Sequence, residues 1–238
     1  MTRPALLDNV NHRHLRVRTE RSAALGDARQ FALALPAEFR QLQACFPIVF
    51  QNVDGNVGFQ PIVLLGLEPD QNLFLTDAGW DAPVVPMAMQ RDPFLIGRSG
   101  DDLKLHVDLD SPRIVRPEEG EVGTAVFMPH GGHSEYLDHV VSLLEHLHAH
   151  AQHLPVFIDA LTRHQLLEPF VFDIESPDGQ QSRLSGLFTI HEERLAALSG
   201  ETLETLQRDG HLLPIYMQIA SLAHLHDLVE RQNRLARI

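Results

Sequence analysis

The sequence contains few of the residues on which several kinds of site depend. It has one cysteine, Cys45, so no internal disulfide can form and a cysteine-based zinc site is excluded. We expect Cys45 to be a small buried side chain beside the first strand, with a reactive nucleophile as the alternative. No run approaches the roughly 18 apolar residues of a membrane span, and the polar start lacks the apolar region of a secretory signal. The sequence thus predicts a cytoplasmic protein without a membrane span.

Basic residues are also scarce. The chain has 19 Lys and Arg against 32 Asp and Glu, which gives a formal net charge of −13. Such a charge argues against a surface that neutralises nucleic-acid phosphates. The length of 238 residues and the 44% hydrophobic content suit a single domain with a substantial core. Within this domain, 1–238, we expect an N-terminal arm at 1–25, a sheet-rich part at 26–116 and a helical and hairpin part at 133–238.

Apolar runs separated by turn residues predict most of the sheet. Residues 46–50, 61–67 and 73–75 are three such runs, and they indicate consecutive antiparallel strands. The middle run shows no alternation, so we expect it to be central and covered on both faces. Residues 95–98 and the alternating residues 103–109 predict two further strands. A hairpin is expected over residues 170–174 and 182–190, around a Ser-Pro-Asp-Gly turn.

Helical periodicity appears mainly in the second half of the chain. The longest helix is expected after Ser134, with Leu137, Val140 and Leu144 on its apolar face. Shorter helices are expected at residues 156–167, 191–198 and 201–208. A last helix, from Leu212 to about Leu235, is expected to bury one face, formed by Leu213, Tyr216, Ile219, Ala220, Ala223 and Leu228. The fold class is therefore α+β, a mostly antiparallel sheet of about seven strands with helices concentrated in the C-terminal half.

Fifteen histidines are the most unusual feature of the composition. On a helical wheel, His139, His146, His150 and His153 share the side opposite the apolar face. Spacings of three and four residues suit chelation of zinc or another transition metal, and His146 with His150 is the best pair. The alternative is a solvated polar face that is rich in histidine. We favour it because no carboxylate accompanies these residues on that face.

A second candidate metal site is the sequence His106-Val107-Asp108. It matches the H-x-D start of a non-haem iron facial triad, and His164 or His191 would complete the set. Both side chains lie on one face of the expected strand. Asp110 continues the same polar face, however, and this favours an ordinary solvated strand over an iron site. No cofactor is therefore predicted, and iron or zinc remains the alternative.

A third candidate is an interaction surface around the single tryptophan. Tryptophan, methionine and arginine are enriched in protein interfaces. The alternative is that these side chains belong to the core. The candidate surface consists of Trp80, Pro86, Met87, Met89, Arg91 and Phe94.

Several stretches together give the chain a family resemblance. They are FPIVF (46–50), PIVLLGL (61–67), GWD (79–81), RDPF (91–94), DLDSPR (108–113), LLEPF (166–170) and LSGLF (184–188). In this order the chain resembles the bacterial SapC-like family, named for a protein encoded with surface-layer genes. The resemblance implies a small bacterial protein without assigned catalytic residues. It also implies genomic neighbours that resemble iron- and 2-oxoglutarate-dependent, cupin-like and flavin halogenase-like proteins and outer-membrane receptors, which suits an accessory role.

The sequence thus favours a non-catalytic binding or accessory protein that acts through a protein partner or a homodimer. Two alternatives stay open. One is an iron- and 2-oxoglutarate-type metalloenzyme that uses His106 and Asp108. The other is a surface-layer-associated component. Whether the chain is an enzyme is not decided by these residues.

Overall fold

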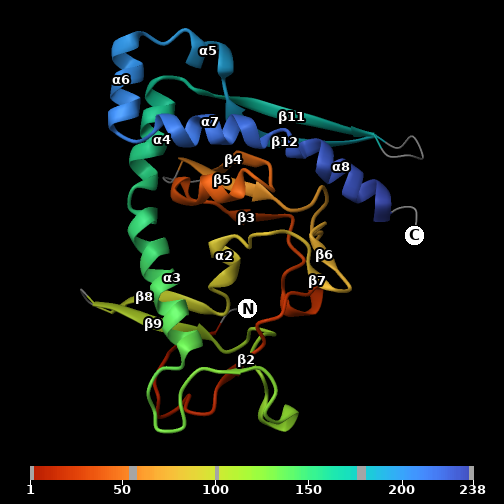
Figure 1. Cartoon of the computed structure of the whole chain (residues 1–238), viewed down its shortest axis with the longest axis vertical. Helices are drawn as coiled ribbons and strands as arrows, with labels where there is room; N and C mark the ends of the chain where they lie inside the picture. Colours follow the sequence, from red (N-terminus) through yellow and green to blue (C-terminus); the bar gives the residue numbers. More distant parts are fainter. Residues whose placement is uncertain (1–2, 54–57, 100–101, 176–180, 236–238) are drawn as a thin grey trace. The chain divides into compact units, whose positions relative to one another are not determined.

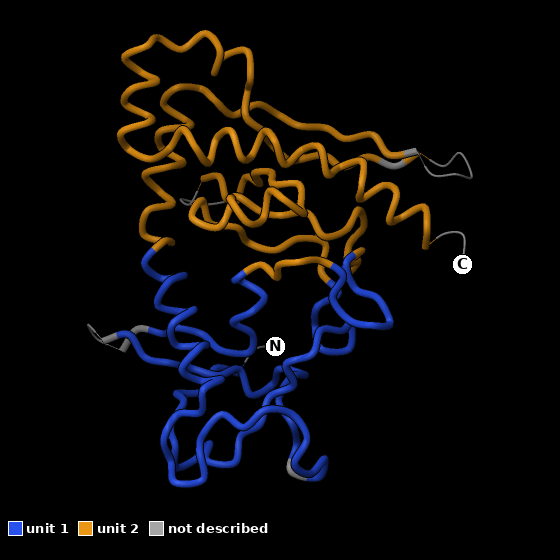
Figure 2. Tube along the Cα trace, in the orientation of Figure 1, with its two compact units in different colours: residues 1–28, 74–81, 87–149 blue, residues 29–73, 82–86, 150–238 orange. Residues whose placement is uncertain are grey.

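The computed structural model describes residues 3–53, 58–99, 102–175 and 181–235 (Figure 1). The chain forms two compact units (Figure 2). Unit 1 comprises residues 1–28, 74–81 and 87–149, and unit 2 comprises residues 29–73, 82–86 and 150–238. Helices and antiparallel strands are both present, so the predicted α+β class is confirmed. The expectation of one domain stays a prediction.

Unit 2 is built on an antiparallel five-stranded sheet in the order β11-β12-β4-β5-β3. Its strands are β3 (Phe31–Leu33), β4 (Ile48–Val53), β5 (Gly58–Leu64), β11 (Leu167–Glu175) and β12 (Gln181–Ile190). The apolar run at 61–67 begins inside β5, which has strand neighbours on both sides. Residues 62–65 are buried, so the prediction of a central, doubly covered run is confirmed.

The hairpin of β11 and β12 is also confirmed, with Leu167 opposite Ile190 at its base. Its Ser-Pro-Asp-Gly turn lies outside the described residues. The third apolar run does not continue the main sheet as predicted. Leu75 starts the two-residue strand β6 (Leu75–Thr76), which pairs with β7 (Gly79–Trp80) in unit 1. The run is too short to span the sheet, and the Asp-Ala-Gly turn folds it back on the residues that follow.

The helices of unit 2 alternate with the sheet strands at first, and the last four follow β12. They are α1 (Phe39–Leu42), α4 (Leu154–Arg163), α5 (Glu192–Ala196), α6 (Gly200–Arg208), α7 (Leu212–Ser221) and α8 (His224–Leu235). A 3-10 turn, Pro36–Glu38, leads into α1. Among the described residues, no helix has both the length and the apolar character that crossing a bilayer requires.

One buried amide ties α7 to the sheet. Strand β12 pairs with β4 only through Leu187 and Phe188, so beyond that point the two strands separate. The Gln218 side chain fills the gap: its Nε2 donates to the Ile48 carbonyl at 2.7 Å, and its Oε1 accepts from the Ile190 N–H at 3.3 Å. Gln218 thereby satisfies backbone groups that a neighbouring strand would otherwise pair.

The Ser221 side chain completes this link. Its hydroxyl oxygen accepts from the Ile48 N–H at 2.9 Å and donates to the Gln218 carbonyl at 2.5 Å. Gln218 and Ser221 are both fully buried. One helix face therefore supplies the polar groups that the opened sheet needs.

This link overturns the face predicted for the last helix. The helix is divided at Ala223 into α7 and α8, and α7 buries Pro214, Ile215, Gln218 and Ser221. Leu213 and Tyr216, which were expected inside, are 50% and 53% exposed, and Ala220 and Ala223 are exposed as well, whereas Leu228 on α8 is buried as predicted. The prediction was wrong because hydrophobicity alone decided it, whereas the unpaired strand groups select the face that carries an amide and a hydroxyl.

Unit 1 contains smaller sheets. Strands β1 (Pro4–Leu6), β9 (Asp102–Asp108) and β8 (Phe94–Ser99) pair in that order, and β2 (Arg16–Val17) pairs with β10 (Thr124–Ala125). Its helices are α2 (Met87–Gln90) and most of α3 (Glu135–Ala151), whose Leu137, Val140 and Leu144 are buried as predicted. The 3-10 turns Ala23–Leu25 and Pro117–Glu119 complete the unit.

A buried ion pair holds the irregular segments of unit 1. Arg113 Nη2 lies 2.6 Å from both carboxylate oxygens of Asp27, and both residues are almost fully buried. Arg113 Nη1 also donates to the carbonyls of Arg18 and Glu20, and Arg21 Nη1 donates to Asp27 and to the Met89 carbonyl. Such a pair is costly to break, because removing one partner leaves the other charge buried.

We expect Gln218→Leu to lower the free energy of unfolding by about 2–4 kcal/mol, because the Ile48 carbonyl and the Ile190 N–H lose their buried partners. Urea denaturation followed by circular dichroism measures this. Gln207→Leu, an exposed position on α6, is the matched control and should change stability little. Equal stability of the two variants would show that Gln218 does not fix α7.

Candidate functional site

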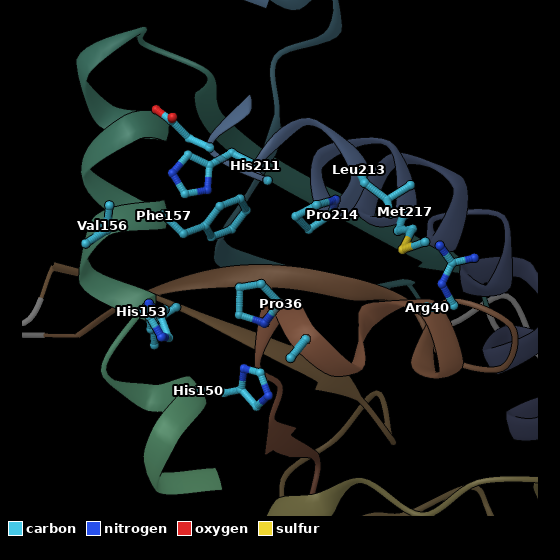
Figure 3. Close-up of a pocket in the computed structure, with 14 residues that line it drawn as sticks. Pro36, Arg40, His150, His153, Val156, Phe157, His211, Leu213, Pro214 and Met217 are labelled. Carbon is cyan, nitrogen blue, oxygen red and sulfur yellow. The ribbon is translucent and has the colours of Figure 1, made fainter. Parts of the chain in front are cut away.

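A groove in unit 2 is walled by three segments that are distant in the sequence (Figure 3). These are the turn into α1, the start of α4 and the start of α7. The groove has a volume of about 450 Å³, a size typical of small-molecule sites. Its apolar wall is formed by Pro36, Ala37, Leu154, Val156, Phe157, Leu213, Pro214 and Met217.

Local sequence explains why α4 and α7 begin at this groove. Pro155 occupies the first turn of α4, where a missing N–H and a fixed φ are tolerated. His153 precedes α4 and His211 precedes α7, and neither side chain caps its helix. Both imidazoles therefore remain free of a capping role, and each helix directs its positive dipole end toward this region.

Polar side chains border the apolar wall. His150, His153 and His211 line the groove, and Figure 3 shows Arg40 at the opposite end from His153. The His211 ring lies 5.6 Å from the Phe157 ring, centroid to centroid. Burial lowers the pKa of His211, against a smaller opposing effect of the Asp209 carboxylate. The imidazole of His211 is thus held neutral at neutral pH, and it can donate one hydrogen bond and accept another.

The apolar wall is open to solvent in part. Val156 is 59% exposed and Leu213 is 50% exposed, whereas Phe157 at the base is buried. Phe157 is fixed there by an edge-to-face contact with Phe39, at 6.4 Å between centroids. A rigid aromatic base beneath exposed aliphatic walls can hold an apolar group by removing it from water.

The histidines predicted to form one polar stripe differ in environment. His139, His146 and His153 are exposed, and His150 is half-buried in the groove wall. Among the described residues, no three His, Cys, Asp or Glu side chains form a group that could hold a metal ion. A metal site at His146 and His150 therefore stays a prediction, and it has two proposed ligands.

His106 and Asp108 lie on β9 in unit 1, and local contacts orient both. His106 Nδ1 is 3.0 Å from the Lys104 carbonyl, which leaves Nε2 as the acceptor in the neutral ring. Asp108 Oδ1 accepts from the backbone N–H groups of Arg3 and Asp110. Through these contacts the Asp108 carboxylate has a structural role: it links the residue before β1 to the end of β9. The iron site at these residues stays a prediction.

The interaction surface predicted around Trp80 is partly covered. The structure buries Pro86, Met89 and Phe94, with Met89 and Phe94 fully inaccessible. Trp80 is half-buried and stacks on Phe74 at 5.9 Å between ring centroids. Met87 and Arg91 are also half-buried. Only Trp80, Met87 and Arg91 can therefore meet a partner in this conformation.

Cys45 is half-buried after α1. Burial raises the pKa of its thiol, and the smaller opposing effect comes from Arg231. A raised pKa reduces the thiolate fraction at neutral pH, and the thiolate is the reactive form. Cys45 is therefore less buried than expected, and the raised pKa of its thiol disfavours the alternative of a reactive nucleophile.

Sequence reasoning missed the groove. Arg40, His211 and Pro214 carried no signal as a set, because they belong to three segments that only the fold brings together. The sequence offered one hint. The segment that forms α7 has apolar residues on more than one face, so that Leu213 and Tyr216 stay exposed when Ile215 is buried.

These features define an α+β protein with a ligand-sized groove between helices. The chain belongs to the SapC family, because the family model SapC matches residues 7–228. The comparison with curated proteins gave no match, and the comparison with solved structures gave none. The family resemblance read from the sequence is thereby confirmed, and it covers both units.

We expect purified, tag-free protein to contain iron and zinc well below one equivalent, since no three His, Cys, Asp or Glu side chains of the described residues form a group that could hold a metal ion. Mass spectrometry of the metals after dialysis measures this. His106→Ala should leave the metal content unchanged. One equivalent of iron that disappears in His106→Ala would instead establish the metalloenzyme.

Proposed function

We propose that this chain is a non-catalytic binding protein that holds a ligand in the unit 2 groove and serves a protein partner, or its own dimer, as an accessory protein. The observation that supports the proposal is the exposed apolar surface of α4 and α7. Val156 and Leu213 are each at least half exposed although they border a preformed groove. Apolar side chains gathered in this way mark binding surfaces.

The hydrophobic effect supplies the driving force for binding at these side chains. Removing apolar surface from water contributes about 25 cal/mol per Å². The cost of immobilising the protein is small, because Phe157 and Pro214 are already fixed in the core of unit 2. The groove is therefore preorganised for an apolar group.

The β11 edge of the main sheet is a poorer site for a partner than the groove. Strand β11 is the last in the order and has β12 on one side. Pro169 lacks the N–H that a further strand would need, and the register shifts between Phe170 and Phe172. Proline and a bulge are devices that block strand addition, so the groove is the better surface.

Two rival proposals remain from the sequence. The metalloenzyme at His106 and Asp108 is tested by metal content. A surface-layer-associated component predicts export, whereas the binding protein is proposed to stay in the cytoplasm. Cell fractionation with an antibody against the chain distinguishes these locations.

We expect the neutral dye Nile red to bind the wild-type protein with enhanced fluorescence. Leu213→Glu should weaken this binding by about tenfold or more, because a carboxylate in the apolar wall must lose water when the dye enters. Titration of the fluorescence measures the dissociation constants, and light scattering on the same samples records the oligomeric state.

The matched control is Leu235→Glu, since Leu235 is a helical leucine of unit 2 with similar exposure, 54%. It should bind the dye as the wild-type protein does. Identical binding by wild-type, Leu213→Glu and Leu235→Glu proteins would remove the groove as the binding surface.

A further inference from the structure

The charges around the groove are not balanced. Asp209 has a basic neighbour, since its carboxylate lies 3.5 Å from Arg208 Nε. Arg40 is exposed, and its guanidinium forms no ion pair with any carboxylate of the described residues. The end of the groove at Arg40 therefore carries a positive charge that lacks a counter-charge within the protein.

The groove wall next to Arg40 does not supply that counter-charge. The wall between Arg40 and the histidines consists of carbon and sulfur groups, namely Pro36, Phe157, Leu213, Pro214 and Met217. Arginine binds carboxylates through two parallel N–H groups, and such charge-assisted hydrogen bonds are roughly twice as strong as neutral ones. The groove therefore has a cationic end at Arg40 next to an apolar wall.

We propose that the groove binds an organic anion: a small molecule with an apolar body and one carboxylate. The carboxylate pairs with Arg40, and the apolar body lies along Leu213 and Pro214 toward Phe157. This assignment rests on the proposed function, which states only that the groove binds a ligand.

The opposite orientation is disfavoured by the residues at the other end. Asp209 lies there, and the His211 imidazole is held neutral by burial. A ligand carboxylate placed at that end would meet the like charge of Asp209, which already occupies Arg208, whereas Arg40 offers a guanidinium that has no carboxylate partner among the described residues. The anionic group therefore belongs at Arg40.

The net charge of the chain, −13, acts against any anion at long range. At about 0.1 M salt this field is screened beyond roughly 10 Å, whereas a direct contact with Arg40 is not. Selectivity for the anion thus depends on the short-range pairing and on Arg40 alone among the charged groups of the groove.

A set of probes that share one apolar body tests the charge of the ligand. Octanoate, octan-1-ol and octylammonium have the same chain and differ in charge. We expect calorimetric titration of the full chain to give about tenfold tighter binding of octanoate than of octan-1-ol, and weaker binding of octylammonium.

Substitution at Arg40 identifies the group responsible. Arg40→Gln should reduce octanoate affinity to that of octan-1-ol and leave octan-1-ol binding unchanged, and Arg40→Lys should retain part of the preference. Arg163→Gln is the control, because it removes the same charge from α4 at a residue that does not line the groove. Circular dichroism verifies that each variant is folded.

The outcomes separate the two proposals. If all three probes bind equally, or if Arg40→Gln leaves the preference for octanoate intact, the organic anion is overturned and the binding groove stands. If no probe binds and Leu213→Glu behaves as wild type toward Nile red, the groove itself is overturned, and the anion with it.

Discussion

The arrangement of unit 2 depends on the buried amide of Gln218. Where strands β12 and β4 separate, backbone donors and acceptors lose their partners in the sheet. Burying such groups without a hydrogen bond costs more free energy than most side-chain contacts contribute. Gln218 and Ser221 satisfy these groups, so they determine which face of α7 turns inward. Leu213 and Tyr216 are exposed as a result. The apolar wall of the groove is thus a consequence of the hydrogen bonding beneath it.

Unit 1 contains a comparable constraint in the pair of Arg113 and Asp27. This ion pair joins the short strands and loops of the unit, and Arg113 also donates hydrogen bonds to the carbonyls of Arg18 and Glu20. Arg113 ends the DLDSPR stretch that contributes to the family resemblance, and the structure gives this residue a structural role. Burial beside this pair also raises the pKa of Tyr136 to about 12.

Periodicity predicted those elements whose burial is decided by apolar side chains. The continuous run at 61–67 and the alternating run at 103–109 gave β5 and β9, and the apolar face of α3 was placed correctly at Leu137 and Leu144. The same reasoning failed on α7, where an amide and a hydroxyl are inside. It also failed for the groove, because spacing along the chain does not report which turns meet in space. A hydrophobic pattern along the sequence does not predict which polar groups are buried or which loops lie close together in the fold.

Electrostatics distinguishes the groove from another cavity of similar size. A cavity of about 490 Å³ in unit 1 is lined by Leu7, Ile96 and Val141, but also by the carboxylates of Asp8 and Glu145 beside Lys104. Two acidic groups against one basic group disfavour an anion there. The groove of unit 2 is lined by one basic and one acidic residue, and Arg40 has no carboxylate partner among the described residues, so the two cavities differ in the charge of the ligand they suit.

The most direct test of this account is the location of bound octanoate by nuclear Overhauser effects to assigned methyl groups. The account predicts contacts from the octanoate chain to the methyl groups of Val156, Leu213 and Met217, with the carboxylate end nearest Arg40. Contacts confined to Leu7, Ile96 and Val141 of unit 1 would contradict it.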